Sequence, residues 1–362
     1  MIPKPAEGVF VQGIDHPDLH LWDAWSCTDG DALHLYCLAV SRRLADGTPL
    51  KAETRNNHPF HIRHFRSDDA GLSWQDLGVF QQHQQAEDGH DSRSIWSGSV
   101  MRLNSGQWLF GYTGLRERGA QHSFVQSLAA GLSDDGMVLT LGSQQLLLCP
   151  ERDYELIRSK GYYLDNRENL GSHQGEAGGP ILAWRDPFMF YDLAGQLMMA
   201  WAAKKSATEN AMGLARLSLE GGQIKINELM APITLPDAQT FSQLEIPKIY
   251  VDPIKSRYLL IIAASTRTSE QQPDHEIEKT MRLYSSYSLT GPWQPGGTST
   301  SVIGNTPNYF AMTVLQTNFK AEQLSCISPT TEVANKPLTF AAPFTIDLKD
   351  LSRAEQLIAQ RN

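Results

Sequence analysis

Three things are scarce in this 362-residue sequence: long apolar runs, cysteine and excess basic charge. No run of about 18 apolar residues occurs, which argues against a membrane-spanning helix. The N-terminus shows no basic stretch followed by an apolar one, so no signal peptide is visible; cytoplasmic residence is the default expectation, with leaderless secretion left open. The formal charge of −9 argues against nucleic acid or an anionic membrane as the main partner.

The four cysteines, Cys27, Cys37, Cys149 and Cys326, form neither a Cys-x-x-Cys pair nor a Cys/His cluster. A structural zinc site requires such spacing, so we expect no metal and no cofactor. Four cysteines in a chain this long do not indicate a disulfide scaffold either. We interpret them as buried, reduced thiols.

Short apolar runs, rich in β-branched and aromatic residues and bounded by Gly, Asp, Asn or Pro, predict strands along most of the chain. The clearest cover residues 32–40, 94–102, 108–112, 188–191, 197–202, 246–251 and 258–263. Asp29-Gly30, Asp46-Gly47, Asn104-Ser105-Gly106 and Asp135-Gly136 favour hairpin turns. The one clear helical pattern is 351–360, with Asp350 as a candidate N-cap.

Many short strands without helices predict an all-β protein, as a propeller, a large sandwich or a β-helix. The absence of a strict repeat disfavours the β-helix, and the absence of a Pro/Ser-rich linker favours one domain over residues 1–362. The segment Ser67-x-Asp69-x-Gly71-x-x-Trp74 resembles the Asp box, a hairpin turn on sialidase propeller blades that lies far from the chemistry. It supports a propeller.

Three acidic residues occur in apolar, aromatic-rich, strand-like surroundings, where a charge is costly unless it has a use. Asp23 lies between Trp22 and Trp25, Asp186 opens an apolar strand, and Glu245 begins another. Cleavage of a glycosidic bond needs two carboxyl groups flanking it, and furanosidases usually add a third that grips the sugar. The wide spacing of the acids along the chain is what we expect if successive blades each contribute one acid to a common pocket.

These segments resemble glycoside hydrolase family 68, the levansucrases, inulosucrases and bacterial β-fructofuranosidases. The matching stretches occur in the family's order, from about residue 15 to 320: Trp22-Asp23, Trp96-Ser97-Gly98-Ser99, Tyr112-Thr113-Gly114, Arg185-Asp186-Pro187, Glu245-Ile246-Pro247, a Ser-Tyr-Ser-Leu-Thr-Gly-Pro-Trp run ending at Trp293, and a Val-Ile-Gly-Asn run ending at Asn305. The resemblance implies a five-bladed β-propeller with a central acidic pocket, and we expect the segment from about residue 340 to pack on its outside.

The resemblance also implies roles in a retaining mechanism. Asp23 would attack the anomeric carbon of a fructosyl unit, Glu245 would act as acid and then base, and Asp186 would bind fructosyl hydroxyls. In that mechanism nucleophile and acid lie about 5–5.5 Å apart. The residues expected to bind the substrate are Trp22, Trp96, Ser97, Arg185, Gln243 and Arg267.

One departure from the family pattern concerns the leaving group. The family usually has arginine directly after the acid/base glutamate, where this chain has Ile246. That arginine helps to hold the non-fructosyl part of sucrose, so the substrate is expected to be sucrose-like or another fructoside, and hydrolysis and transfer both stay open. Two alternatives remain: an arabinofuranosidase of the family 43 type, and a carbohydrate-binding propeller without catalysis.

Overall fold

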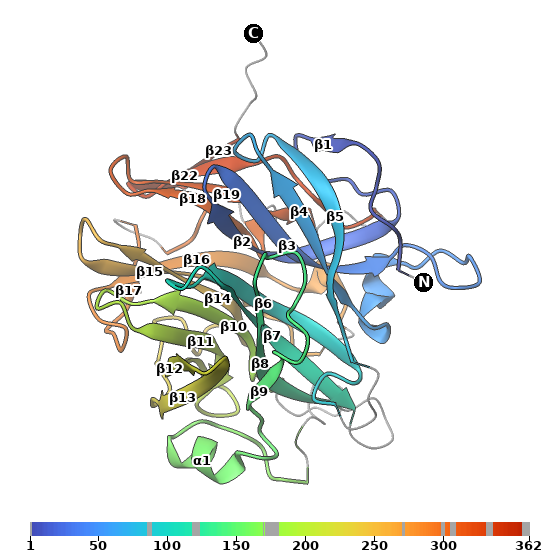
Figure 1. The fold of residues 1–362 in the computed structure, drawn as a ribbon. Coiled ribbons are helices and arrows are strands. Elements are labelled where there is room, and N and C mark those ends of the chain that lie inside the picture. The colour runs from blue at the N-terminus through green and yellow to red at the C-terminus, as the bar shows by residue number, and fades with distance from the viewer. Residues whose placement is uncertain are drawn as a thin grey trace.

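The short apolar runs of the sequence form antiparallel strands, and these assemble into five sheets around a central axis, a five-bladed β-propeller (Figure 1). The computed structural model describes residues 2–84, 89–117, 124–168, 170, 181–269, 272–297, 301–304, 309–330 and 336–356. All seven predicted strand segments are confirmed, and the predicted run 94–102 matches its strand to the residue.

The first two blades come from the N-terminal part of the chain. Blade I has the strand order β1-β5-β4-β3-β2, with β1 (Val9–Val11), β2 (Leu19–Asp29), β3 (Ala32–Ser41), β4 (His61–Ser67) and β5 (Ser73–Gln82). Blade II follows in chain order, with β6 (Ser94–Arg102), β7 (Trp108–Glu117), β8 (Phe124–Ser133) and β9 (Gln145–Leu148).

The remaining blades follow the same plan. Blade III has β10 (Arg185–Tyr191), β11 (Leu197–Lys204), β12 (Asn210–Glu220) and β13 (Gln223–Leu229). Blade IV has β14 (Gln243–Asp252), β15 (Arg257–Ser265), β16 (Lys279–Ser286) and β17 (Gln294–Pro295). Blade V has the order β18-β19-β22-β23, with β18 (Thr313–Asn318), β19 (Gln323–Ile327), β22 (Phe344–Asp347) and β23 (Asp350–Gln356).

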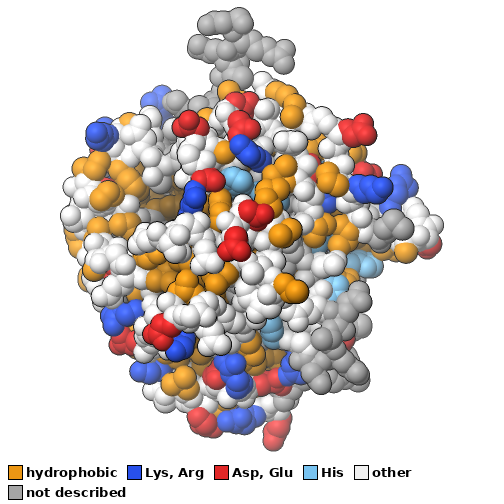
Figure 2. Space-filling view, viewed as in Figure 1, with side chains coloured by type: hydrophobic (Ala, Val, Ile, Leu, Met, Phe, Trp, Pro, Cys, Tyr) orange, Lys and Arg blue, Asp and Glu red, His pale blue; other side chains and the backbone are white. Residues whose placement is uncertain are grey.

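Few elements lie outside the blades. A two-stranded sheet pairs β20 (Pro329–Thr330) with β21 (Thr339–Phe340). The described helical segments are η1 (Ala52–Asn57), α1 (Tyr154–Ser159) and η2 (Asp274–Glu276). None of the described helices is long and apolar enough to cross a membrane. Figure 2 shows acidic and basic side chains interspersed over one face of the molecule.

Apolar clusters fill the space between each blade and the next, including between blade V and blade I. Between blades I and II, for example, the rings of Tyr36 and Phe110 meet edge-on with centroids 5.0 Å apart. Burying one such side chain contributes about 1.5–3 kcal/mol. The blades are therefore held together by side-chain packing.

Hydrogen bonds between distant parts of the chain close the ring. The Ile14 and Leu21 amides donate to the carbonyl oxygens of Phe340 and Leu338, at 2.9 and 3.0 Å. The Ser26 hydroxyl donates to the Val314 carbonyl at 2.6 Å. Strand β2 is thereby fastened to the C-terminal part of the chain.

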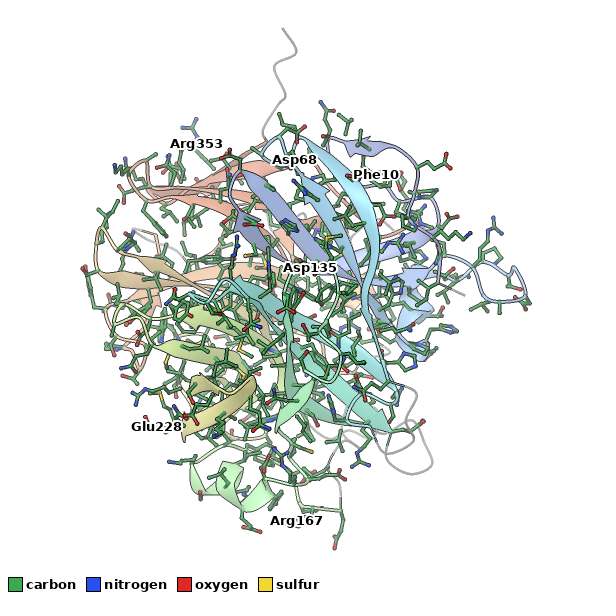
Figure 3. All side chains as sticks on the ribbon, viewed as in Figure 1. Phe10, Asp68, Asp135, Arg167, Glu228 and Arg353 are labelled. Carbon is green, nitrogen blue, oxygen red and sulfur yellow. The ribbon has the colours of Figure 1, made fainter. Side chains whose placement is uncertain are left out.

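The Asp-box interpretation is confirmed as a structural turn. The Gly71 amide donates to the Ser67 hydroxyl at 2.8 Å, and the Ser73 amide donates to Asp69 at 2.8 Å. Blade II has a similar but tighter turn after β8, where the Gly136 amide donates to Ser133 and the Met137 amide donates to Asp135 (Figure 3). The turn thus recurs between the third and fourth strands of a second blade.

The predicted C-terminal helix is wrong. Asp350–Gln356 forms β23, the outermost strand of blade V, paired with β22. Residues 357–360 of the predicted helix lie outside the described residues, as does Asn305 of the Val-Ile-Gly-Asn run. All four cysteines are free; Cys37, Cys149 and Cys326 are buried, as predicted, and Cys27 is only partly buried.

Candidate active site

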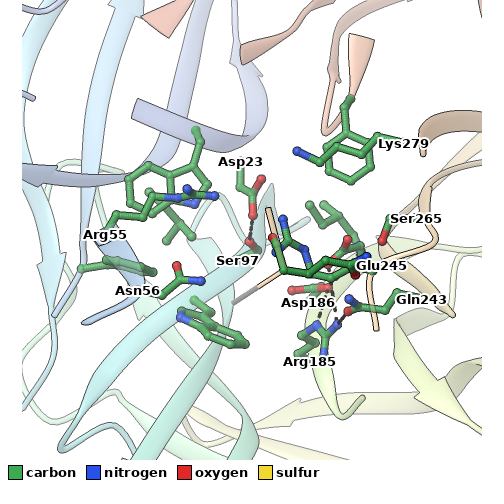
Figure 4. A pocket seen from close by; sticks show the side chains of 18 of the residues that line it. Asp23, Arg55, Asn56, Ser97, Arg185, Asp186, Gln243, Glu245, Ser265 and Lys279 are labelled. Carbon is green, nitrogen blue, oxygen red and sulfur yellow. Dashed lines mark hydrogen bonds and ion pairs between the residues drawn. The ribbon is translucent and has the colours of Figure 1, made fainter. Parts of the chain in front are cut away.

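One pocket at the centre of the propeller brings together all nine residues singled out in the sequence (Figure 4). They come from β2, β6, β10 and β14 and from the loop after β15: Trp22, Asp23, Trp96, Ser97, Arg185, Asp186, Gln243, Glu245 and Arg267. These four strands are the innermost of their blades, since β6 contacts both β2 and β10, and β10 contacts β14. Segments more than 200 residues apart thus share one site.

Each of these inner strands is irregular where it meets the pocket. The pairing register shifts between Trp22 and Ala24, between Trp96 and Gly98, between Arg185 and Phe188, and between Glu245 and Lys248. Asp23, Asp186 and Ile246 have positive φ angles of 38°, 62° and 54°. A bulge re-aims a side chain that an ordinary strand would hold in alternation, and bulges are frequent beside active sites.

Asp23 receives a hydrogen bond from blade II. The Ser97 hydroxyl donates to its carboxylate at 2.7 Å. Burial raises the pKa of Asp23, whereas this hydrogen bond and the positive charges of Lys248 and Arg55 act in the opposite direction. The site thus holds a partly buried carboxylate that the Ser97 hydroxyl helps to align.

Asp186 is buried and connects three blades. Its backbone amide donates at 2.8 Å to the hydroxyl of Thr113, which itself donates at 3.0 Å to the carbonyl of Ser97. Its carboxylate accepts a hydrogen bond of 2.9 Å from the amide of Ile246. Burial raises the pKa of Asp186 to about 7, although the Arg185 charge opposes the rise. The Tyr-Thr-Gly stretch matters here because it supplies this linking threonine.

Arg185 lies between Asp186 and Glu245. Its guanidinium is 3.7 Å from the Asp186 carboxylate and 3.6 Å from that of Glu245, whose side chain is 21% exposed. It also donates to the carbonyl of Leu182 at 2.8 Å and to the side chain of Gln243. The buried guanidinium therefore lies within ion-pair distance of both carboxylates.

A second cation is buried behind the pocket. Lys248, on β14, is fully buried and donates at 2.6 Å to the carbonyl of Met312. Burial lowers its pKa to about 8, while the carboxylates of Asp23 and Asp186 act to raise it. Its ammonium therefore contributes positive charge to the acidic centre.

Aromatic rings form part of the wall. Trp22 is 5% exposed and meets Phe60 edge-on at 4.7 Å, and the Arg55 guanidinium lies 5.3 Å from its ring centre. Trp96 is partly exposed and packs against Phe124. Both rings also belong to or touch the apolar cluster between blades I and II, so they are core residues as well as wall residues.

The pocket also has lining residues that the sequence patterns did not predict. Residues that also line it are Glu53, Arg55 and Asn56 of η1, Ser265 and Gln272, and Lys279 and Phe310. They come from a short helical turn, from strand ends and from loops. Arg267, Gln272 and Pro273 line the pocket from the segment that follows β15. The other residues carried no local signal.

No protein-family profile and no curated protein matches this sequence. Solved structures do match it. An inulosucrase from Halalkalicoccus jeotgali bound to kestose superposes with a TM-score of 0.67 at 18% identity, covering 98% of this chain and 90% of that one. A Bacillus subtilis levansucrase gives 0.65 at 17%, covering 95% and 87%, and a B. megaterium levansucrase variant gives 0.63 at 15%, covering 94% and 85%. The chain therefore shares, over nearly its whole length, the propeller fold of the levansucrases and inulosucrase, the enzymes that its sequence motifs resemble.

Proposed function

We propose that this protein is a retaining glycoside hydrolase or transferase that cleaves a β-fructofuranosyl linkage. The observation that carries the proposal is the convergence of Asp23, Asp186 and Glu245, from three blades, on one pocket with Arg185 between two of them. Each of the three acids stands in apolar, strand-like surroundings, where a charge is costly unless it has a use.

In the first step, the Asp23 carboxylate attacks the anomeric carbon of the fructosyl unit. Glu245 gives its proton to the glycosidic oxygen, so that the bond breaks and the leaving sugar departs as an alcohol. The hydrogen bond from Ser97 to Asp23 aligns the nucleophile. In this proposal Asp186 and Arg185 bind fructosyl hydroxyls beside the reacting carbon, and the Asp186 carboxylate stabilises the positive charge that develops there in the transition state.

In the second step, the fructosyl-Asp23 ester is broken. Glu245, now ionised, takes a proton from a water molecule or a sugar hydroxyl, whose oxygen attacks the anomeric carbon and releases Asp23. Water gives hydrolysis, and a sugar gives transfer. The two reactions differ only in the acceptor, so one site serves both.

The substrate class follows from motifs and fold together. A levansucrase of the same fold has been crystallised with sucrose, and the inulosucrase with kestose. Both sugars contain a β-fructofuranosyl unit. A fructoside of this kind is therefore the substrate we propose.

The test is product analysis by chromatography after incubation with sucrose and with kestose. We expect release of fructose or formation of fructosylated products, lowered at least about 1,000-fold in Asp23→Asn. Asp68→Asn is the matched control, because Asp68 is exposed on the turn after β4 and paired with Arg66. Turnover of an arabinofuranoside and no fructoside would contradict the proposal in favour of the family 43 alternative. Binding of fructosides without any turnover would favour the non-catalytic propeller.

A further inference from the structure

Arg63 and Arg185 are both buried beside carboxylates, but they pair with them differently. Arg63 is fully buried and donates to both oxygens of Asp76, at 2.8 and 2.6 Å. This is the forked pairing that a guanidinium and a carboxylate commonly form. Arg185 is 3% exposed, yet its ion pairs with Asp186 and Glu245 are 3.7 and 3.6 Å long. The guanidinium of Arg185 is thus held short of a hydrogen bond with either acid.

Neutral acceptors occupy the Arg185 guanidinium instead. Its Nη1 donates to the carbonyl of Leu182 at 2.8 Å and to the side-chain oxygen of Gln126 at 3.4 Å. Its Nη2 donates to the side-chain oxygen of Gln243, which lies beside it in Figure 4. These three hydrogen bonds set the position and the plane of the guanidinium, and none of the acceptors carries a charge.

Gln126 reaches Arg185 from the neighbouring blade. It is on β8 of blade II, is 5% exposed and is not among the residues that line the pocket. Its side-chain oxygen also accepts a hydrogen bond of 3.0 Å from the Trp184 amide, and its side-chain nitrogen donates to the Leu182 carbonyl at 3.5 Å. One amide group therefore contacts both the backbone that leads into β10 and the side chain of its first residue.

The absence of charge on this acceptor decides what Arg185 can do. A carboxylate at the same place would form an ion pair like that of Arg63 and would cancel the positive charge of the guanidinium. An amide accepts the hydrogen bond and leaves that charge in place. Burial raises the pKa of Asp186, and the Arg185 charge opposes the rise. Arg185 thus acts on the acids without using their oxygen atoms.

Those oxygen atoms are what a fructoside needs. Among the described residues, the Asp186 carboxylate accepts a hydrogen bond from the Ile246 amide, and no hydrogen bond reaches the carboxylate of Glu245. In the proposed mechanism Asp186 binds sugar hydroxyls and Glu245 transfers a proton to the leaving oxygen. A guanidinium hydrogen-bonded to either carboxylate would compete with the sugar for it.

We propose that Gln126 is a positioning residue, whose neutral amide holds the Arg185 guanidinium short of hydrogen bonds with Asp186 and Glu245 so that both carboxylates stay open to the fructoside. This inference rests on the proposed function for its substrate. Gln243 supplies the second neutral side-chain acceptor, so the guanidinium is held between blade II and blade IV.

The substitution Gln126→Glu separates this role from a purely structural one. The new carboxylate can still accept from the Trp184 amide and from Arg185, so a structural role predicts an unchanged kcat. Positioning by a neutral amide predicts that the guanidinium pairs with the new carboxylate and that kcat for sucrose or kestose falls about 10–100-fold, the range for one hydrogen bond to a charged group. An unchanged kcat would overturn the inference.

Gln145→Glu is the matched control. Gln145 is on β9 of the same blade and likewise accepts a backbone amide of blade III, that of Ile224 at 2.9 Å, but it does not line the pocket or contact Arg185. This variant should keep the kcat of the unchanged protein. An equal fall in both variants would show that any new charge between these two blades lowers kcat, which also overturns the inference.

A second measurement does not depend on catalysis and uses Gln126→Met, which removes the acceptor. In its crystal structure we expect the Arg185 guanidinium to lie about 3 Å from an oxygen of Asp186 or Glu245. A guanidinium that keeps its position would refute the inference and leave the proposed function intact. If neither sugar is turned over by the unchanged protein but the guanidinium moves in this variant, the proposed function fails and the positioning role of Gln126 stands.

Discussion

The Asp186 carboxylate accepts a hydrogen bond from the backbone amide of Ile246, the residue that follows Glu245. A β-branched residue at a φ of 54° is a genuine backbone outlier, of the kind that costs about 1–3 kcal/mol and persists only when its surroundings hold it. The bond ties the bulge of blade IV to the acid of blade III. The acid proposed to bind the sugar thus helps to fix the backbone that carries the proposed acid/base.

Replacing Asp186 by asparagine should increase stability while removing activity. Because the pKa of Asp186 is raised to about 7, the folded state disfavours its charged form, and the resulting loss of stability develops as pH rises from about 4 to 7. Asp186→Asn should therefore raise Tm by a few degrees at pH 8 and by less at pH 4. Thermal unfolding at both pH values tests this. An equal shift at both would show that ionisation of Asp186 is not the cause.

Ser97 and Ser99 allow a matched comparison within one motif. The Ser97 hydroxyl donates to Asp23, whereas the Ser99 hydroxyl accepts from the Met189 amide at 2.8 Å. Ser97→Ala should lower kcat about 10–100-fold, because a hydrogen bond to a charged group contributes about 1.5–3 kcal/mol. Ser99→Ala should instead lower the free energy of unfolding by about 1–3 kcal/mol, since it leaves a buried amide unpaired. Steady-state kinetics and urea unfolding of both variants distinguish the roles; a larger loss of kcat in Ser99→Ala would reverse them.

Lys248 should influence the pH profile. Its charge acts to lower the pKa of Asp23, so Lys248→Met should move the acid limb of kcat/KM to higher pH. Lys204→Met is the control: Lys204 is also buried with its pKa lowered to about 8, but it hydrogen-bonds Asn210 and Ser242. A pH profile that moves equally in both variants would exclude a specific effect on Asp23.

Close backbone packing explains why the Trp-Ser-Gly-Ser segment has glycine at position 98. A Cβ at this position would lie 1.9 Å from the Gly111 carbonyl oxygen and 2.8 Å from the Tyr112 Cα, both backbone atoms that cannot move aside. Gly98→Ala should therefore destabilise the protein by about 4 kcal/mol or more, the range of severe core defects. Gly106→Ala meets no atom within 4 Å and costs only the strain of its φ of +91°. Chemical unfolding measures the free energy of unfolding of the two variants. A similar loss of this free energy in both would contradict this account.

The sequence predicts the site residues on the inner strands better than the lining residues that come from other elements. Asp23, Asp186 and Glu245 stand in strand-like surroundings where a charge is conspicuous, so local context identifies them, and the resemblance to family 68 adds Trp22 and Arg185. Lys279 and Arg55 are ordinary polar residues at a strand start and a helical turn, and only the closed ring brings them to the pocket. The positive φ angles at Asp23 and Asp186 are equally invisible in the sequence, because neither residue is glycine.

The wrong helix at the C-terminal end has a physical cause. The pattern after Asp350 suits a helix locally, but β22 presents an unpaired edge, and pairing with it satisfies the backbone of Asp350–Gln356. Tertiary pairing therefore overrides local preference. The strand edge of another segment is information that a local pattern does not contain.

The fastening of β2 to the C-terminal part of the chain has a consequence for how activity appears during folding. Each blade is built from neighbouring segments and can form early, since its contacts are local in sequence. Asp23, however, is positioned only once the strand carrying it joins residues more than 280 positions away, through Ser26–Val314 and Leu21–Leu338. Catalysis should thus be the last property to recover on refolding, and the return of activity would time the moment when the ring closes.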